Sequence, residues 1–141
     1  MTLFILDSDH LSLYQQGHKS LRQHILTLQP TQIAITIVSV EELIRGRLAQ
    51  IRRATKPQSR LSAYHWLSET LDFLCKLPVL KYNRQADQRF EILRAQKIRI
   101  GTQDLRIAAI ALSQNAVLVT RNRRDFEKVP DLVFQDWSDS P

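Results

Sequence analysis

The stretch GTQDLRIAAIALSQNAVLVT, residues 101–120, decides the fold. Gly101 and Thr102 mark the start of a helix, and residues 105–112 are apolar around nearly the whole helix, which predicts a helix buried on all sides. Its small alanines allow it to lie close to a sheet. Residues 116–120 then predict a strand. This helix and strand together are typical of an α/β protein.

The rest of the chain repeats this alternation of short apolar runs and longer helical segments. The expected strands lie at residues 3–6, 32–37, 78–82, 116–120 and 132–135. The expected helices lie at about 8–17, 19–28, 39–56, 59–76, 84–97 and 105–112, with a short helical piece within 121–128. We therefore predict one α/β domain over residues 1–141, with a central, mainly parallel sheet of four to five strands flanked by helices in an α/β/α arrangement.

One predicted helix, residues 59–76, carries a clear apolar stripe. Because Tyr64 belongs to this stripe, we expect it to be buried, and we expect the same of Trp66 and Trp137. The stripe consists of Leu61, Tyr64, Leu67, Leu71 and Leu74.

The overall composition is that of a folded soluble protein, with 43% hydrophobic and 24% charged residues. The single cysteine, Cys75, cannot form an internal disulfide and gives no sign of an oxidising compartment. Residues 1–6 lack the basic start of a signal peptide, and no apolar run approaches the length of a membrane span. We therefore expect a cytoplasmic protein that has no membrane segment.

The charge distribution favours an anionic partner, with nucleic acid first. The formal net charge is +6, and every charged residue between positions 45 and 60 is basic. This basic run fits equally well a solvated helix face followed by a loop, or an edge that follows the phosphates of a nucleic acid. The candidate RNA-contacting residues are Arg45, Arg47, Arg52, Arg53, Arg121 and Arg123.

Four acidic residues fall at corresponding places in the predicted fold. Asp7 ends the first strand, and Asp125 follows the fourth. Glu42 and Asp104 each lie in the expected first turn of a helix. In a parallel α/β sheet, the carboxyl ends of strands and the first turns of the following helices share one edge, where such folds bind their ligands. We therefore expect these carboxylates to line one cleft.

Each acid also has a structural interpretation. Ser39 and Glu42 match a capping box, and Asp104 favours the dipole of its helix. Asp7 and Asp125 could cap the helices that follow them. However, two carboxylates about 4 Å apart repel each other by roughly 4 kcal/mol at an effective dielectric of 20, whereas helix-dipole contacts return only about 0.3–1 kcal/mol each. A divalent cation resolves this imbalance most simply.

Oxygen-only ligands suit Mg²⁺ or Mn²⁺. Such an ion lowers the pKa of a bound water and stabilises a leaving oxygen, which is the chemistry of phosphodiester cleavage. The residues thus favour a metal-dependent nuclease that holds phosphates with its basic side chains.

Four motifs resemble those of PIN-domain nucleases of the VapC toxin type, and they occur in the family order over essentially the whole chain. The first is LDSDHLS (6–12) and the second SVEELIRG (39–46), whose pattern points to Glu42 over Glu41. The third and most specific is IGTQDLRIAA (100–109). The fourth is TRNRRDF (120–126), with Trp137 near the end.

The resemblance implies a PIN-like fold and an endoribonuclease that depends on Mg²⁺ or Mn²⁺, acting as the toxin of a type II toxin–antitoxin pair. It implies structured RNA, frequently tRNA, as the substrate, a small antitoxin as partner, and a homodimer. Thr120 and Asn122 would assist by positioning water or an acid. The implied metal-binding and catalytic acids are Asp7, Glu42, Asp104 and Asp125.

Three residues depart from the family pattern. Asp9 stands where many relatives carry asparagine, Lys97 replaces a common glycine, and Asn83 occupies a place often held by aspartate. None of these changes removes one of the four acids, but they leave substrate choice and metal affinity open. The alternative is a nucleic-acid-binding module with an unused or degenerate metal site.

Overall fold

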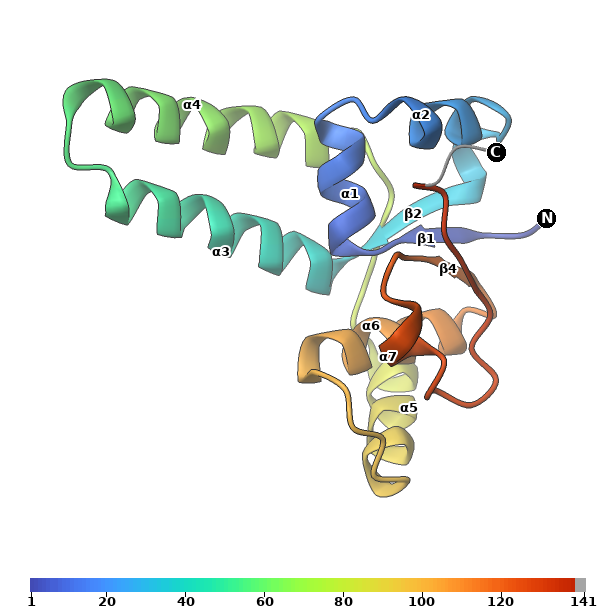
Figure 1. The fold of residues 1–141 in the computed structure, drawn as a ribbon. Coiled ribbons are helices and arrows are strands. Elements are labelled where there is room, and N and C mark those ends of the chain that lie inside the picture. Colours follow the sequence, from blue (N-terminus) through green and yellow to red (C-terminus); the bar gives the residue numbers. More distant parts are fainter. Residues whose placement is uncertain (139–141) are drawn as a thin grey trace.

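The computed structural model describes residues 1–138 and confirms the predicted α/β fold (Figure 1). Its strands form one sheet in the order β3-β2-β1-β4-β5, and every neighbouring pair is parallel. The strands are β1 (Phe4–Leu6), β2 (Ile33–Thr36), β3 (Val79–Leu80), β4 (Val117–Val119) and β5 (Phe134–Gln135).

Each predicted helix is present, with boundaries that differ by a few residues. Within residues 1–138, no helix is both long and apolar enough to cross a membrane. The helices are α1 (Ser8–Gln15), α2 (Lys19–Leu26), the 3₁₀ turn η1 (Pro30–Gln32), α3 (Ile37–Arg53), α4 (Pro57–Leu74), α5 (Arg84–Ala95), α6 (Thr102–Ser113) and α7 (Arg123–Phe126).

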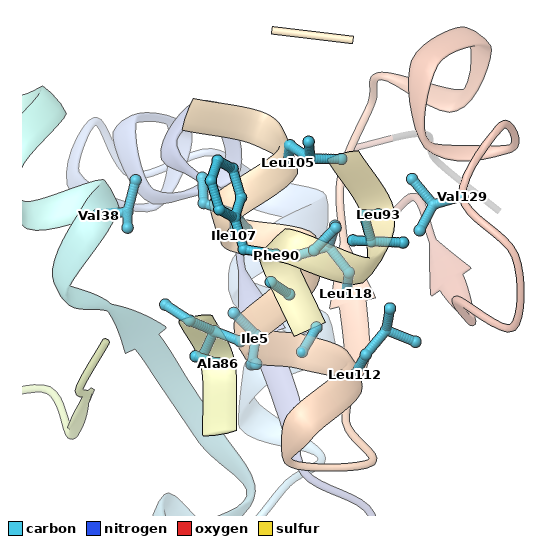
Figure 2. Close-up of a cluster of buried hydrophobic side chains, with 14 of the residues drawn as sticks. Ile5, Val38, Ala86, Phe90, Leu93, Leu105, Ile107, Leu112, Leu118 and Val129 are labelled. Atoms are coloured by element: carbon cyan, nitrogen blue, oxygen red, sulfur yellow. The ribbon is translucent and has the colours of Figure 1, made fainter. Parts of the chain in front are cut away.

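Helices cover both faces of the sheet, as predicted. Successive residues of a strand point to opposite faces, so Ile5 belongs to one core and Leu6 to the other. The Ile5 core contains the buried apolar residues of α5 and α6, with Val129 beside them (Figure 2). Phe126 also belongs to this core. The Leu6 core contains residues from α1, α2, α3 and α4. The central strands are therefore buried on both sides, which explains their continuous apolar sequence.

Helix α6 is the most buried helix, in agreement with its apolar sequence. Its residues 107–111 are fully buried between the sheet and α5. The alanines at 108, 109 and 111 have no side chain beyond Cβ, so the helix backbone lies close to its neighbours. This packing fixes the position of the amino-terminal end of α6, which carries Asp104.

Helices α3 and α4 form a hairpin that projects beyond the sheet (Figure 1). Because little besides α3 packs against the outer part of α4, the prediction of a buried apolar stripe is wrong there. Tyr64 is 57% exposed and Trp66 is 42% exposed, whereas Leu74, near the sheet, is 6% exposed. Trp137 is buried as predicted, at 4% exposure.

Helix α3 begins two residues earlier than the sequence indicated. Thr36, the last residue of β2, is its N-cap, and the Thr36 side chain accepts a hydrogen bond from the backbone N–H of Ser39. Ser39 therefore lies inside the first turn rather than at the cap. As a consequence, Glu42 lies in the second turn of α3. The prediction that it lies in the first turn is wrong.

The strand order places a topological switch point between β1 and β4. From β1 the chain builds the sheet outward through β2 and β3, and then returns to the other side of β1 with β4 and β5. Ligands of open α/β sheets bind at the carboxyl ends of the strands at such a point. Asp7 follows β1 and Thr120 follows β4, so both lie at this position.

Candidate active site

Asp7 connects the ends of the two central strands. It is the N-cap of α1, and its Oδ1 accepts a hydrogen bond of 2.9 Å from the backbone N–H of His10. Its Oδ2 accepts a hydrogen bond of 2.6 Å from Oγ1 of Thr120. The two side chains are almost completely buried. Helix capping therefore accounts for only one oxygen of Asp7, while the other is held at the switch point.

Glu42 is directed toward α1 rather than toward the start of its own helix. Its Oε1 accepts a hydrogen bond from Oγ of Ser8, the residue after Asp7. The Ser8 hydroxyl also lies 3.0 Å from the hydroxyl of the buried Ser39. The capping box proposed for Ser39 and Glu42 is thus not formed, because Thr36 caps the helix. These contacts bring Glu42 to the same sheet edge as Asp7.

The neighbouring acid, Glu41, has different surroundings. It is exposed, and its carboxylate accepts hydrogen bonds from Arg45 at 2.6 Å and from Gln103 at 2.8 Å. It is therefore paired with a cation, whereas the half-buried Glu42 is bonded to a neutral hydroxyl. This contrast agrees with the choice of Glu42 made from the motif.

Asn122 connects the remaining two acids. It is the N-cap of α7, and its side-chain N–H lies 3.0 Å from Oδ2 of Asp125 and 3.4 Å from Oδ2 of Asp104. Asp125 also forms a 3.7 Å ion pair with Lys128. Asn122, not Asp125, is therefore the capping residue, and Asp125 is one of the acids that the cap holds.

The ionised form of Asp104 is disfavoured by its surroundings. The pKa of the Asp104 carboxyl is raised from 3.8 to about 6, first by burial and then by the negative charges of Glu42, Asp7 and Asp125, in that order. The hydrogen bond from Asn122 acts in the opposite direction. Asp104 is thus repelled by three carboxylates that are distant from it in the sequence.

A family model for the PIN domain matches residues 8–132. The chain belongs to the PIN-domain family. Two curated relatives of similar length support this assignment. A tRNA(fMet)-specific endonuclease VapC from Salmonella typhimurium is 30% identical over 141 residues, which covers 97% of this chain and 99% of the relative. Ribonuclease VapC1 from Haemophilus influenzae is 29% identical over 140 residues, which covers 96% and 98%.

Solved structures give the same result. The DNA-bound VapBC structure from Salmonella typhimurium matches this PIN domain with a TM-score of 0.74 and 27% identity, covering 97% of this chain and 99% of the other. A DNA-bound VapBC2 structure from Rickettsia felis has a TM-score of 0.77 at 24% identity, covering 96% and 99%, and supports the fold. The predicted family and the predicted enzyme class, a nuclease, are thereby confirmed.

The acid cluster of this PIN domain offers only oxygen ligands, the donors that Mg²⁺ and Mn²⁺ prefer. Within residues 1–138, however, no three His, Cys, Asp or Glu side chains are grouped so as to hold a metal ion. The four carboxylates have different partners: Asp7 accepts from Thr120, Glu42 accepts from Ser8, and Asp104 and Asp125 share Asn122. Mg²⁺ is commonly held by one or two carboxylates together with waters and substrate phosphates. The donor set therefore fits such an ion without a complete cage.

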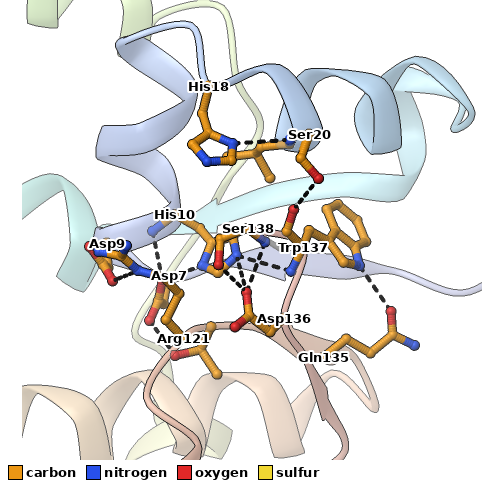
Figure 3. Close-up of polar contacts among 12 residues, drawn as sticks. Asp7, Asp9, His10, His18, Ser20, Arg121, Gln135, Asp136, Trp137 and Ser138 are labelled. Carbon is orange, nitrogen blue, oxygen red and sulfur yellow. Dashed lines mark hydrogen bonds and ion pairs between the residues drawn. The ribbon is translucent and has the colours of Figure 1, made fainter. Parts of the chain in front are cut away.

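Arg121 lies at the edge of the acid cluster, where Asp9 holds it. Nε and one terminal nitrogen of Arg121 donate to the two carboxylate oxygens of Asp9 at 2.7 and 2.8 Å (Figure 3). Both side chains are about half exposed, at 48% and 47%. Asp9 is the residue that departs from the common asparagine, and its extra charge is compensated by this arginine.

The other candidate RNA-contacting arginines are not equivalent. Arg47 is half-buried, donates a 2.9 Å hydrogen bond to Thr70 and lies over the ring of Trp66, so it has a packing role between α3 and α4. Arg45 pairs with Glu41. Exposed positions are occupied by Arg52, Arg53 and Arg123.

His10 is the feature of the site that the sequence did not reveal. It is fully buried in α1, and its imidazole lies between Asp7 and the segment that follows β5 (Figure 3). The only sequence signal was its place three residues after Asp7, which puts the two residues on one side of the first helical turn.

Proposed function

We propose that this PIN domain is a divalent-metal-dependent endoribonuclease that acts in the cytoplasm as the toxin of a toxin–antitoxin pair and cuts structured RNA, with tRNA as the first candidate. The observation that carries the proposal is the convergence of four carboxylates at the switch point of a basic protein. Two relatives, ribonuclease VapC1 and the tRNA(fMet)-specific endonuclease VapC, support the reaction and the substrate class.

In this proposal the acids hold a Mg²⁺ or Mn²⁺ ion, with Asp7 and Asp104 as ligands and Glu42 and Asp125 completing the set. When bound, the ion supplies an activated water and stabilises the leaving oxygen. Thr120 keeps the Asp7 carboxylate in place through its 2.6 Å hydrogen bond. Asn122 positions Asp104 and Asp125 relative to each other.

Exposed arginines provide the RNA contacts in this proposal. Arg121 lies beside the acids, and Arg52 follows Glu42 by ten residues along α3, which corresponds to about 15 Å of helix. An RNA strand whose scissile phosphate lies at the acids could therefore reach the basic end of α3. Arg47 contributes least, because its guanidinium is already bonded to Thr70 and stacked on Trp66.

The proposed protein partners are a small antitoxin and a second copy of the chain. Several large apolar side chains of the α3–α4 hairpin are exposed, including Leu61 at 68% and Leu71 at 48%. Contiguous exposed apolar surface marks protein interaction sites. The related structure from Salmonella typhimurium is itself a VapBC complex, which supports an antitoxin as partner.

Cleavage of RNA by purified protein tests the proposal. Wild type should cut total tRNA in millimolar Mg²⁺ or Mn²⁺ and stop in EDTA, and Asp7→Asn should lose at least a hundredfold in rate. Asp72→Asn is the matched control, since Asp72 is an exposed acid on α4. Undiminished cutting by Asp7→Asn, or full activity in EDTA, would refute the metal-dependent mechanism.

A metal-binding measurement separates the enzyme from the alternative, a binding module with an unused metal site. A cation that binds only the folded state raises stability, by about 2.7 kcal/mol at a hundredfold excess over its Kd. We expect Mn²⁺ to raise the melting temperature of wild type and not that of Asp7→Asn. RNA binding by both proteins, with neither cleavage nor a Mn²⁺ effect in wild type, would establish the alternative.

A further inference from the structure

The buried imidazole of His10 connects the acid cluster with the segment that follows β5. One ring nitrogen, Nδ1, lies 3.5 Å from Oδ1 of Asp7. The other, Nε2, accepts a 3.2 Å hydrogen bond from the backbone N–H of Trp137. The ring itself is completely buried. His10 is therefore in contact with a proposed catalytic carboxylate, while solvent does not reach it.

The contacts of Nε2 assign the tautomer of His10. A buried backbone N–H needs an acceptor, and the N–H of Trp137 uses Nε2, so the proton of a neutral imidazole lies on Nδ1. Asp136 also approaches Nε2, at 3.4 Å, but its Oδ1 already accepts hydrogen bonds from the backbone N–H and the hydroxyl of Ser138. Asp136 therefore has no need of a proton from His10.

The Nδ1–H group then needs a hydrogen-bond acceptor. Among residues 1–138, Nδ1 has no hydrogen bond within the usual limits, and Asp7 Oδ1 is the carboxylate oxygen in front of it. An unsatisfied buried donor is unfavourable, so a small movement of Asp7 toward Nδ1 is favoured. Oδ1 of Asp7 would then accept from both the backbone and the ring of His10, leaving Oδ2 to Thr120.

Trp137 is firmly placed, so it can set the tautomer. Its backbone carbonyl accepts a 3.1 Å hydrogen bond from the Ser20 hydroxyl. Its indole ring is stacked on His24 at 5.1 Å and contacts Phe4 at the same centroid distance. The segment after β5 is thus fixed to α2 and β1, and its N–H presents a constant donor to His10 (Figure 3).

We propose that His10 is a positioning residue for Asp7, and that the backbone of Trp137 sets its tautomer so that Nδ1–H orients the Asp7 carboxylate toward the bound cation. This inference rests on the proposed function for the role of Asp7. Groups that hydrogen-bond to metal ligands commonly change metal affinity or activity by about 10–100-fold when they are replaced.

Two substitutions separate the positioning role from simple burial, because each retains a polar group at only one of the two ring-nitrogen positions. His10→Asn places an amide N–H at the Nδ1 position and loses the acceptor for Trp137. His10→Gln places an amide at the Nε2 position, keeps that acceptor and loses the donor to Asp7. If His10 only fills the core, activity should follow stability in both variants.

We expect the order of activity to differ from the order of stability. His10→Gln should melt at the higher temperature of the two, yet bind Mn²⁺ at least tenfold more weakly in calorimetry and lose at least tenfold in kcat, with KM for RNA unchanged. His10→Asn should be less stable but retain more Mn²⁺ affinity and kcat than His10→Gln. Activity and Mn²⁺ affinity that fall in parallel with melting temperature would overturn the proposal.

Asp136→Asn is the control for the charge beside Nε2, and it should stay within twofold of wild type. A loss equal to that of His10→Gln would overturn the assignment to Trp137. The nitrogen NMR spectrum of the His10 ring, recorded in EDTA, should show the Nδ1–H tautomer, and an Nε2–H tautomer would also overturn it. Because this spectrum needs neither metal nor RNA, it tests the tautomer even if wild type fails to cut RNA or bind Mn²⁺, the result that would refute the proposed function.

Discussion

Replacement of Asp104 by asparagine should make the metal-free protein more stable while it removes activity. Asp104 lies at the third position of α6, half-buried, with its charge opposed by burial and by three other carboxylates. Asparagine has nearly the same shape and no charge. The substitution therefore removes an unfavourable ionisation from the folded state and at the same time removes a proposed metal ligand.

The pKa of Asp104 gives the size of the effect. It rises from 3.8 to about 6, and each pH unit corresponds to about 1.4 kcal/mol, so the upper bound at neutral pH is about 3 kcal/mol. Partial exposure of the side chain and the lost helix-dipole interaction reduce this to roughly 1–2 kcal/mol. For a domain of this size we expect a rise in melting temperature of about 3–8 °C.

The pH dependence has a definite sign. A carboxyl whose folded pKa is raised keeps its proton longer in the folded state, so its favourable contribution is present below about pH 4 and is lost as the pH rises through about 6. Asp104→Asn should therefore gain stability over wild type at pH 7.5 and gain little at pH 4. Asparagine cannot ionise, so its difference from wild type follows the titration of Asp104.

Urea unfolding of both proteins in EDTA, at pH 4 and pH 7.5, measures the effect. RNA cleavage and the Mn²⁺-dependent rise in melting temperature are measured on the same preparations and should both be lost in Asp104→Asn. An equal change in stability at the two pH values, or a variant that is less stable than wild type at pH 7.5, would contradict the convergence of the four acids. Retained cleavage would instead contradict the role of Asp104 in the reaction.

Three further experiments test the arginines. Replacing both Arg52 and Arg53 by alanine should raise KM for RNA and leave kcat unchanged. The plot of the logarithm of the RNA-binding constant against the logarithm of salt concentration should become shallower by about 1.4, because each phosphate contact on a single strand contributes about 0.7 to its slope. Arg47→Ala should leave that slope unchanged but reduce the free energy of unfolding by about 1–2 kcal/mol, because it loses a hydrogen bond and a cation–π contact. Asp9→Asn should release Arg121 toward the acids and so raise the Mn²⁺ concentration needed for half-maximal cleavage, and adding Arg121→Ala should reverse this. The control pair for the first test, exposed on α5, is Arg84→Ala and Arg89→Ala.

The four acids could be singled out from the sequence because each occupies a strand end or an early helical turn. It did not predict the exact place of Glu42, because Thr36 and Ser39 are both good N-cap residues three positions apart. The structure uses Thr36, since its hydroxyl accepts the Ser39 N–H at 3.0 Å while the backbone still belongs to β2. A choice between two hydroxyls depends on where the strand ends, which local pattern does not determine.

The exposure of the α3–α4 hairpin could not be predicted for a different reason. Helical spacing identifies which side of α4 is apolar, but not how far the helix extends beyond the sheet that would cover it. Tyr64 and Leu61 therefore lie on the surface, although Leu74 in the same stripe is buried. Trp137 was correctly expected to be buried, and its environment is made by Phe4 and His24, from segments far away in the sequence.

The donors around the acid cluster explain why the site keeps its negative charge. Asp7 is bonded to Thr120, and Glu42 to Ser8, so both accept from neutral hydroxyls. A guanidinium in either place would cancel the charge that attracts a cation. Arg121 instead forms its ion pair with Asp9, to which Nε and one terminal nitrogen donate. Neutral hydrogen bonds thus hold Asp7 and Glu42 in place and leave their negative charge for the metal ion that we propose.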